Sequence, residues 1–200
     1  MWKWVFPVSG LLAMLGGCGF ADRASRLPEQ AFAEIELTDP QDRALKIRPV
    51  ERKATVFLFA RTDCPISNRY APTVKQLHRN FADRGAGFYL VYVDPRQPGA
   101  EIVAHREAYA YPCAAVCDRD HRFAESVGAR VTPEAVVIDE AGMVAYRGRI
   151  DDRFVDFGTS RQQPTQHDLA MAIEAVLAGR SVEVPVTSAV GCFIGDLKSE

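Results

Sequence analysis

The residue of this sequence best placed to do chemistry is Cys64, in the segment "RTDCPISNRY" (61–70). It follows the apolar run "ATVFLFA" (54–60), which is typical of a strand covered on both faces, and it precedes a segment with helical spacing. A thiol at the start of a helix meets unpaired backbone N–H groups and the positive end of the helix dipole, and both favour the thiolate. Pro65 suits the first helical position. We therefore predict that Cys64 is a nucleophile for thiol exchange, rather than a structural cysteine buried at the end of a strand.

The partner of Cys64 is not adjacent to it in the sequence. Three residues further on stands Ser67, which cannot form a disulfide. The chain has five cysteines, and the other four are Cys18, Cys113, Cys117 and Cys192. A second thiol would therefore have to come from a distant part of the chain.

Cys113 and Cys117 lie in "YPCAAVCD", and three interpretations remain open. If the segment is helical, the two thiols are one turn apart and can form a local disulfide. One of them can instead resolve the oxidised form of Cys64. The third interpretation is a metal site that includes His121, because soft thiolates and imidazole suit copper or zinc.

Cys192 lies in "SAVGCFIGD", beyond the last predicted helix. A C-terminal segment that folds back over the domain can carry its cysteine to Cys64 and resolve the product there. The alternative is a half-buried anchor that holds the tail down.

The first residues indicate export. "MWKW" carries one positive charge, and "VFPVSGLLAMLGG" is a short apolar run that ends in small residues, as in a secretory signal. Leu15 to Cys18 resemble the bacterial lipoprotein signal, which implies lipidation of Cys18. We expect a signal peptide over residues 1–17 and a tether over 18–33. An exported protein keeps its thiols paired or uses them for exchange.

Strand-like and helix-like segments alternate along the rest of the chain. A turn at Asp39-Pro40 separates two short strands, and a hairpin precedes a closing amphipathic helix. This order predicts an α/β domain with a mixed sheet and helices on both faces. The segments are strands at 34–47, 54–60, 87–95, 134–140 and 143–150, and helices at 65–81, 100–110, 121–129 and 166–179.

The domain resembles the thioredoxin superfamily over residues 34–180. Cys64-Pro65-Ile66-Ser67 occupies the place of its CxxC motif, Ala71-Pro72 follows at the family's distance, and "VTPEAVVID" has Thr132-Pro133 where the family carries a cis-proline. The stretch between the first helix and Pro133 is longer than in a minimal thioredoxin, which suggests a peroxiredoxin-like insertion. "TDCPISNRYAP", "YRGRIDDRF" and "AVGCFI" are similar to exported bacterial redoxins of the alkyl hydroperoxide reductase and thiol-specific antioxidant type.

The resemblance implies a thiol oxidoreductase that acts on a protein disulfide or a peroxide. Thr132 and Pro133, with Pro65 and Ser67, would shape the substrate groove, where an extended partner chain can pair with the backbone before the cis-proline. The cycle needs an external electron donor but no dissociable cofactor. Residues 181–200 form a tail that carries Cys192. The protein would face the periplasm, anchored to the bacterial membrane by its lipid.

Two other function classes remain open. One is a copper chaperone or sensor of thioredoxin fold, and the other is a redox-inert adaptor that uses the fold for docking. Arg147 and Arg149 can supply a cationic group near Cys64 or can lie on a solvated strand face. The formal net charge of −2 and the pI near 6.1 argue against a nucleic-acid-binding protein.

Overall fold

A computed structural model describes residues 26–195 of the chain. The predicted signal peptide and Cys18 lie outside the described residues. Within the described part, no helix has the length and apolar character needed to span a membrane.

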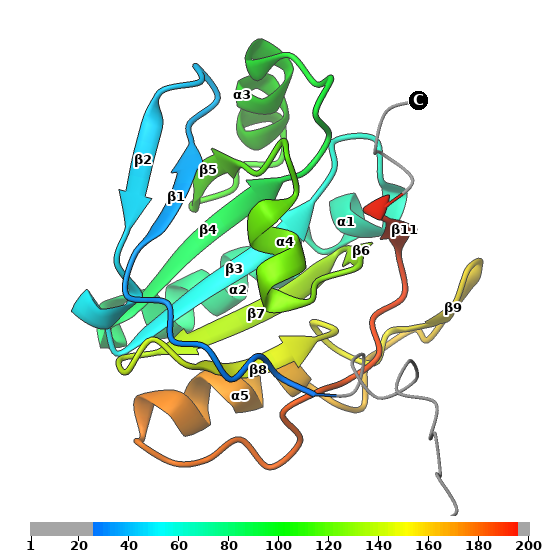
Figure 1. The fold of residues 1–200 in the computed structure, drawn as a ribbon. Coiled ribbons are helices and arrows are strands. Elements are labelled where there is room, and N and C mark those ends of the chain that lie inside the picture. Colours follow the sequence, from blue (N-terminus) through cyan, green and yellow to red (C-terminus); the bar gives the residue numbers. More distant parts are fainter. Residues whose placement is uncertain (1–25, 196–200) are drawn as a thin grey trace, which may run out of the picture.

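The domain is built on a seven-stranded mixed sheet with the order β2-β1-β5-β4-β3-β7-β8 (Figure 1). Neighbours β3, β4 and β5 run parallel, whereas β7 runs antiparallel to β3 and forms a hairpin with β8. The central strand β3 is buried at all seven positions, as its continuous apolar run predicted. The strands are β1 (Ile35–Thr38), β2 (Ala44–Ile47), β3 (Ala54–Ala60), β4 (Ala86–Tyr92), β5 (Ala114–Cys117), β7 (Glu134–Asp139) and β8 (Val144–Gly148).

Helices cover both faces of this sheet, so the predicted thioredoxin-like α/β architecture is confirmed. One hydrophobic core unites the sheet with the apolar side chains of α2 (Ala71–Phe81), α3 (Gly99–Ala108) and α5 (Asp168–Leu177). A second core lies under α4 (Arg122–Val127) on the opposite face (Figure 1). Short 3-10 turns lie at Pro49–Glu51 and Ala82–Arg84.

The structure adds to or differs from what the sequence indicated in three places. The helix expected over 65–81 is divided at Tyr70 into α1 (Pro65–Arg69) and α2, because Pro72 cannot continue the hydrogen-bond ladder of the first turns. The segment with Cys113 and Cys117 contains strand β5 and not a helix. Within the segment expected as a tether over 18–33, Phe32 is buried against Phe123 and donates its N–H to the Gly142 carbonyl.

Four further short strands lie outside the main sheet. β9 (Phe154–Asp156) and β10 (Thr159–Ser160) form a small hairpin that projects from the domain (Figure 1). β6 (Val131–Thr132) immediately precedes Pro133 and β7, and it pairs antiparallel with β11 (Cys192–Phe193) of the tail. The C-terminal segment therefore returns to the end of the sheet where α1 begins.

Phe123 provides a test of the second core. Its ring contacts Phe32, Phe57 and Phe59, and only 5% of the residue is exposed. We expect Phe123→Ala to lower the free energy of unfolding by about 3–5 kcal/mol, because the lost contacts leave a cavity. Urea denaturation measures this change. The control is Met171→Ala on α5. Because Met171 is 54% exposed, the expected change in the free energy of unfolding is below about 0.5 kcal/mol.

Candidate active site

Cys64 is the N-cap residue of α1. Its Sγ accepts the backbone N–H of Ser67 at 3.5 Å and lies 3.1 Å from the carbonyl oxygen of Thr132. The residue is only 1% exposed. Strand β3 ends at Ala60, and the turn that follows brings the thiol to the start of the helix, as the sequence predicted.

The environment of Cys64 favours its thiolate. Burial by itself raises the pKa of the thiol, but hydrogen bonds from Ser67 and from the Cys192 thiol outweigh burial and lower the pKa below its ordinary value. The Ser67 hydroxyl is buried and forms no hydrogen bond among residues 26–195, so the bond to the Cys64 sulfur comes from the Ser67 backbone N–H, while the nearby hydroxyl also favours the thiolate. Ser67 thus occupies the position of a second cysteine in the motif.

Cys192 lies directly beside Cys64. The two Sγ atoms are 3.3 Å apart, and Cys192 is partly exposed where Cys64 is not. Burial, the hydrogen bond to Cys64 and the negative charge of that neighbour raise the pKa of Cys192 to about 11. In the reduced pair Cys64 is therefore the thiol that loses its proton first, and Cys192 keeps its proton.

Thr132 and Pro133 form the opposite wall of this site. The peptide bond between them is cis, as expected from the resemblance to the thioredoxin superfamily. Thr132 lies opposite Cys192 in the β6–β11 ladder, so its backbone contacts both cysteines. The buried Glu134 carboxylate accepts the N–H groups of Arg130 and Val131 and holds the turn that leads to Thr132. Nothing in the sequence pattern singled out Glu134 for this task.

Cys113 and Cys117 are placed differently from Cys192. Because β5 is extended, four residues separate their Cα atoms by about 13 Å, so they are not one turn apart as a helix would have put them. Both are buried, and burial raises the pKa of Cys113 to about 12 and that of Cys117 to about 11. These thiols lack the donors that activate Cys64.

The residues considered for a metal site do not come together. Within the described part of the chain, no group of three or more His, Cys, Asp and Glu side chains could hold a metal ion. His121 is buried, and its Nε2 bonds the carbonyl oxygen of Val93 at 2.6 Å.

The two arginines of β8 and the loop after it pair with carboxylates. Arg147 is not on a solvated face, because it is only 4% exposed and pairs with Glu134, with 3.8 Å between Nε and Oε1. Arg149 pairs with Asp168 at the start of α5 at 2.8 Å. Both arginines thus support the structure around the site.

A polar relay that no sequence motif indicates connects His105 to the Cys64 turn. His105 is 9% exposed, and its Nε2 bonds Asn68 Oδ1 at 2.8 Å while its Nδ1 bonds the Tyr92 hydroxyl at 2.9 Å. Asn68 donates in turn to the Thr62 carbonyl at 2.8 Å, and the Thr62 hydroxyl accepts from Gln97. The relay connects β4 and α3 to the turn that carries Cys64.

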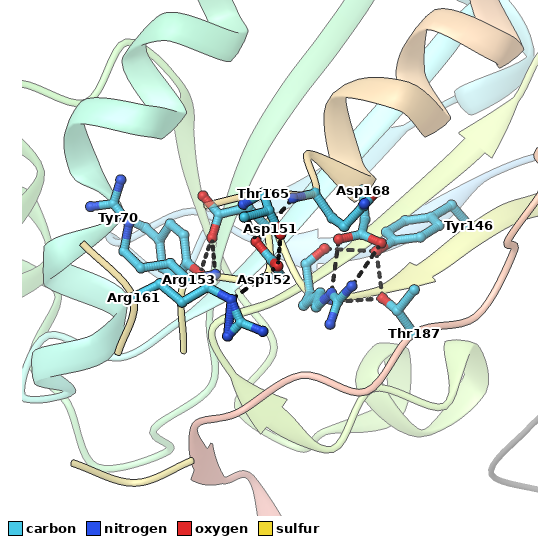
Figure 2. A network of polar contacts seen from close by, with 11 residues as sticks. Tyr70, Tyr146, Asp151, Asp152, Arg153, Arg161, Thr165, Asp168 and Thr187 are labelled. Atoms are coloured by element: carbon cyan, nitrogen blue, oxygen red, sulfur yellow. Dashed lines mark hydrogen bonds and ion pairs between the residues drawn. The ribbon is translucent and has the colours of Figure 1, made fainter. Parts of the chain in front are cut away.

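A second polar network holds the loop between β8 and α5 (Figure 2). The Tyr70 hydroxyl donates to Asp151 at 2.6 Å, which attaches this loop to the junction of α1 and α2. Asp152 accepts hydrogen bonds from the hydroxyl and the backbone N–H of Thr165, and it also pairs with Arg161. These contacts lower the pKa of Asp152. The Tyr146 hydroxyl contacts Thr187 at 2.6 Å and so connects the network to the C-terminal tail (Figure 2).

Comparison with known proteins agrees with this geometry. Residues 28–147 match the family described as the AhpC/TSA family. The chain belongs to this family. Its thioredoxin-like fold and its activated thiol at the start of α1 are those of a thiol-dependent oxidoreductase of the AhpC/TSA family.

The sequence identity between this chain and its individual relatives is low. The thiol-disulfide oxidoreductase ResA of Halalkalibacterium halodurans is 24% identical over 140 residues, which cover 68% of this chain and 78% of ResA. A hypothetical protein of Sinorhizobium meliloti is 22% identical, with a TM-score of 0.73 over 84% of this chain and 93% of that one. An uncharacterised protein of Geobacillus kaustophilus is also 22% identical, with a TM-score of 0.72 over 85% and 92% of the two chains. The two solved structures share the fold of this chain.

Ser67→Ala tests the source of the low pKa of Cys64. Removing the hydroxyl takes away the side-chain group that most favours the thiolate, and we expect the pKa of Cys64 to rise by about 1. The pH dependence of Cys64 alkylation, followed by mass mapping of the modified peptide, measures the change. Ser126→Ala is the control, because its hydroxyl donates to the Phe123 carbonyl in α4. An unchanged pH profile in Ser67→Ala would assign the shift to the other donors.

His105 makes the stability of the protein depend on pH. Burial lowers its pKa, and the hydroxyl of Tyr92 and the carboxamide of Asn68 match a neutral ring. Because the unfolded chain takes up the proton first, stability falls as the pH drops below about 6.5, by at most about 1.4 kcal/mol per pH unit for this group. We expect His105→Gln to flatten this part of the curve of unfolding free energy against pH. His167→Gln, at an exposed position, should leave the slope unchanged.

Proposed function

We propose that the protein is a membrane-tethered, extracytoplasmic thiol-disulfide oxidoreductase in which Cys64 attacks the substrate and Cys192 resolves the product. The observation that carries this proposal is the distance of 3.3 Å between the two sulfur atoms. A disulfide bond is about 2.05 Å long, so a movement of about 1.2 Å joins them. No other cysteine among the described residues lies within hydrogen-bond distance of Cys64.

The first step is attack by the Cys64 thiolate on the disulfide of a partner protein. A bond forms between Cys64 Sγ and one sulfur of the partner, and the other sulfur leaves as a thiolate. The Cys192 thiolate then attacks Cys64 Sγ. The Cys64–Cys192 disulfide forms and the partner leaves with both of its sulfurs reduced, so the two electrons that it gains come from the cysteine pair. An external dithiol donor restores the pair.

The pKa values give the two cysteines an order of action. At neutral pH Cys192 stays protonated, partly because the Cys64 thiolate accepts its hydrogen bond and repels a second negative charge. Once Cys64 has formed a mixed disulfide, that negative charge is gone. The pKa of Cys192 then falls, and the second thiol becomes a better nucleophile at the step that needs it.

A peroxide is the second candidate substrate, and membership of the AhpC/TSA family favours it. The Cys64 thiolate would take one peroxide oxygen to give a sulfenic acid, and the other oxygen would leave as an alcohol or water after protonation. Cys192 would then displace hydroxide from Cys64 and form the same disulfide. Both substrates thus lead to one oxidised form of the protein.

The location of the enzyme rests on its N-terminal sequence. The apolar run before Cys18 and the Leu15-Gly16-Gly17-Cys18 segment support export and lipidation. Labelling of the full chain with a radioactive fatty acid in a bacterial host tests the anchor, and Cys18→Ala should abolish the label.

Mapping of the disulfide in the oxidised protein tests the proposed pair. We expect one Cys64–Cys192 disulfide, with Cys113 and Cys117 alkylated only after denaturation because both are buried. Cys192→Ser should slow turnover of a protein disulfide or of hydrogen peroxide by more than about tenfold, whereas Cys113→Ser and Cys117→Ser serve as matched controls that keep it. A native disulfide that joins Cys64 to Cys113 or Cys117 would contradict the proposal.

A further inference from the structure

The C-terminal tail lies across the active site as a separate extended strand. Thr187 fixes its start, through the Tyr146 hydroxyl at 2.6 Å and the backbone N–H of Arg149 at 3.0 Å. Ile194 fixes its end, since it is 3% exposed in the second core and its N–H donates to the Arg130 carbonyl at 2.8 Å. Between these anchors the tail carries Cys192 past Cys64.

The tail occupies the place that a bound polypeptide would need. In the described part of the chain, the short strand β6 forms its sheet with β11 alone, and their pairing is antiparallel. An edge strand that pairs with an added extended chain is a common mode of peptide recognition, in which the backbone gives affinity and side-chain pockets give specificity. Cys192 fills the position next to Cys64, where the sulfur of a substrate must lie to react.

The contacts of the tail indicate which side chains a polypeptide bound along the edge of β6 can carry. A Cβ atom at Gly191 would lie 2.1 Å from the Thr132 carbonyl oxygen, so the residue before the cysteine has no room for a side chain. Two residues after the cysteine, Ile194 fills an apolar position that is closed to solvent. Between them Phe193 is 56% exposed, so this position places little restriction on the side chain of a bound polypeptide.

We propose that the edge of β6 is a binding site for an extended polypeptide with glycine directly before its cysteine and a large aliphatic residue two positions after it, and that the tail is its resident occupant. This inference rests on the proposed function of Cys64. A protein disulfide whose cysteine lies in such a segment reacts when the segment displaces residues 189–195. The tail competes as a tethered ligand, at an effective concentration of the order of millimolar.

Exchange with a labelled peptide tests the site in the full chain. The probe is the peptide Ser-Ala-Val-Gly-Cys-Phe-Ile, whose cysteine is joined by a disulfide to 5-thio-2-nitrobenzoate. The Cys64 thiolate attacks the peptide sulfur, the Cys64–peptide disulfide forms, and the coloured nitrobenzoate thiolate leaves. Every protein in this experiment carries Cys192→Ser. The mixed disulfide therefore persists, and mass mapping can locate it on Cys64.

Displacement of the tail should accelerate this reaction. Gly191→Ala, added to Cys192→Ser, places a methyl group against the Thr132 carbonyl without changing either wall of the peptide site. We expect the rate with the matched peptide to rise by about tenfold or more, because the tethered competitor is weakened. Ile194→Ser is a second tail variant, which loosens the other anchor. Rates that stay unchanged in both variants would show that the tail does not occupy the site.

The peptide sequence supplies the independent comparison. Peptides with alanine for the glycine, or serine for the isoleucine, should react about tenfold more slowly than the matched peptide with the Gly191→Ala protein. The nitrobenzoate disulfide of cysteamine, which is too small to pair with β6, is the reference for the intrinsic reactivity of Cys64. Equal rates for all three peptides, with a reactive reference, would overturn this inference alone. A reference compound that does not react with Cys64 would overturn the proposed function as well.

Discussion

The active site depends on one short ladder between two strands that are far apart in the sequence. β11 pairs with β6, and this pairing brings Cys192 Sγ to 3.3 Å from Cys64 Sγ, across 128 residues of chain. The ladder in turn depends on the sheet and on both cores. The tail is held at Thr187 by groups of β8 and the loop after it, and Ile194 enters the core under α4 on the opposite face. The second thiol therefore reaches its position only in a folded domain, whereas the CxxC arrangement of the superfamily places it within one turn of helix.

The two sulfurs are chemically different because their donors are different. Cys64 is more deeply buried than Cys192, and burial alone would give it the higher pKa. The order is reversed by the start of α1, where the Ser67 N–H and the neighbouring thiol point at the Cys64 sulfur. Cys113 and Cys117 show the contrasting case, since burial without such donors raises the pKa of each. The pKa order of these thiols thus follows the direction of a few N–H and S–H groups and not the degree of exposure.

The elements with a strong periodic pattern could be predicted from the sequence. The buried strand β3, the β7–β8 hairpin and the amphipathic helices α2 and α5 lie close to where their apolar residues indicated. Strand β5 was missed, because a four-residue run of alanine and valine has no periodicity that separates strand from helix. Of the site, Cys64, Thr132 and Pro133 could be placed from their motifs. The position of Cys192 beside Cys64 could not, because it depends on the path of the tail and its pairing with β6. His105 and Glu134 also escaped prediction, since their hydrogen bonds join segments distant in the sequence.

If Cys192 is the resolving thiol, as we propose, its place on a tethered strand imposes a balance on the enzyme. Two residues of ladder hold little free energy, so the tail stays docked mainly because tethering keeps its local concentration high and because Ile194 is buried. A stronger ladder would keep Cys192 beside Cys64 and speed resolution, but it would also shut polypeptide substrates out, since Cys64 is only 1% exposed with the tail in place. A weaker ladder would open the site and leave mixed disulfides unresolved for longer. Gly191 contributes to this balance in a specific way: the absence of a side chain lets the tail approach the Thr132 carbonyl, while the ladder itself remains short. In the proposed mechanism, the length of β11 would set both how fast Cys192 resolves the product and which substrates reach the Cys64 thiolate.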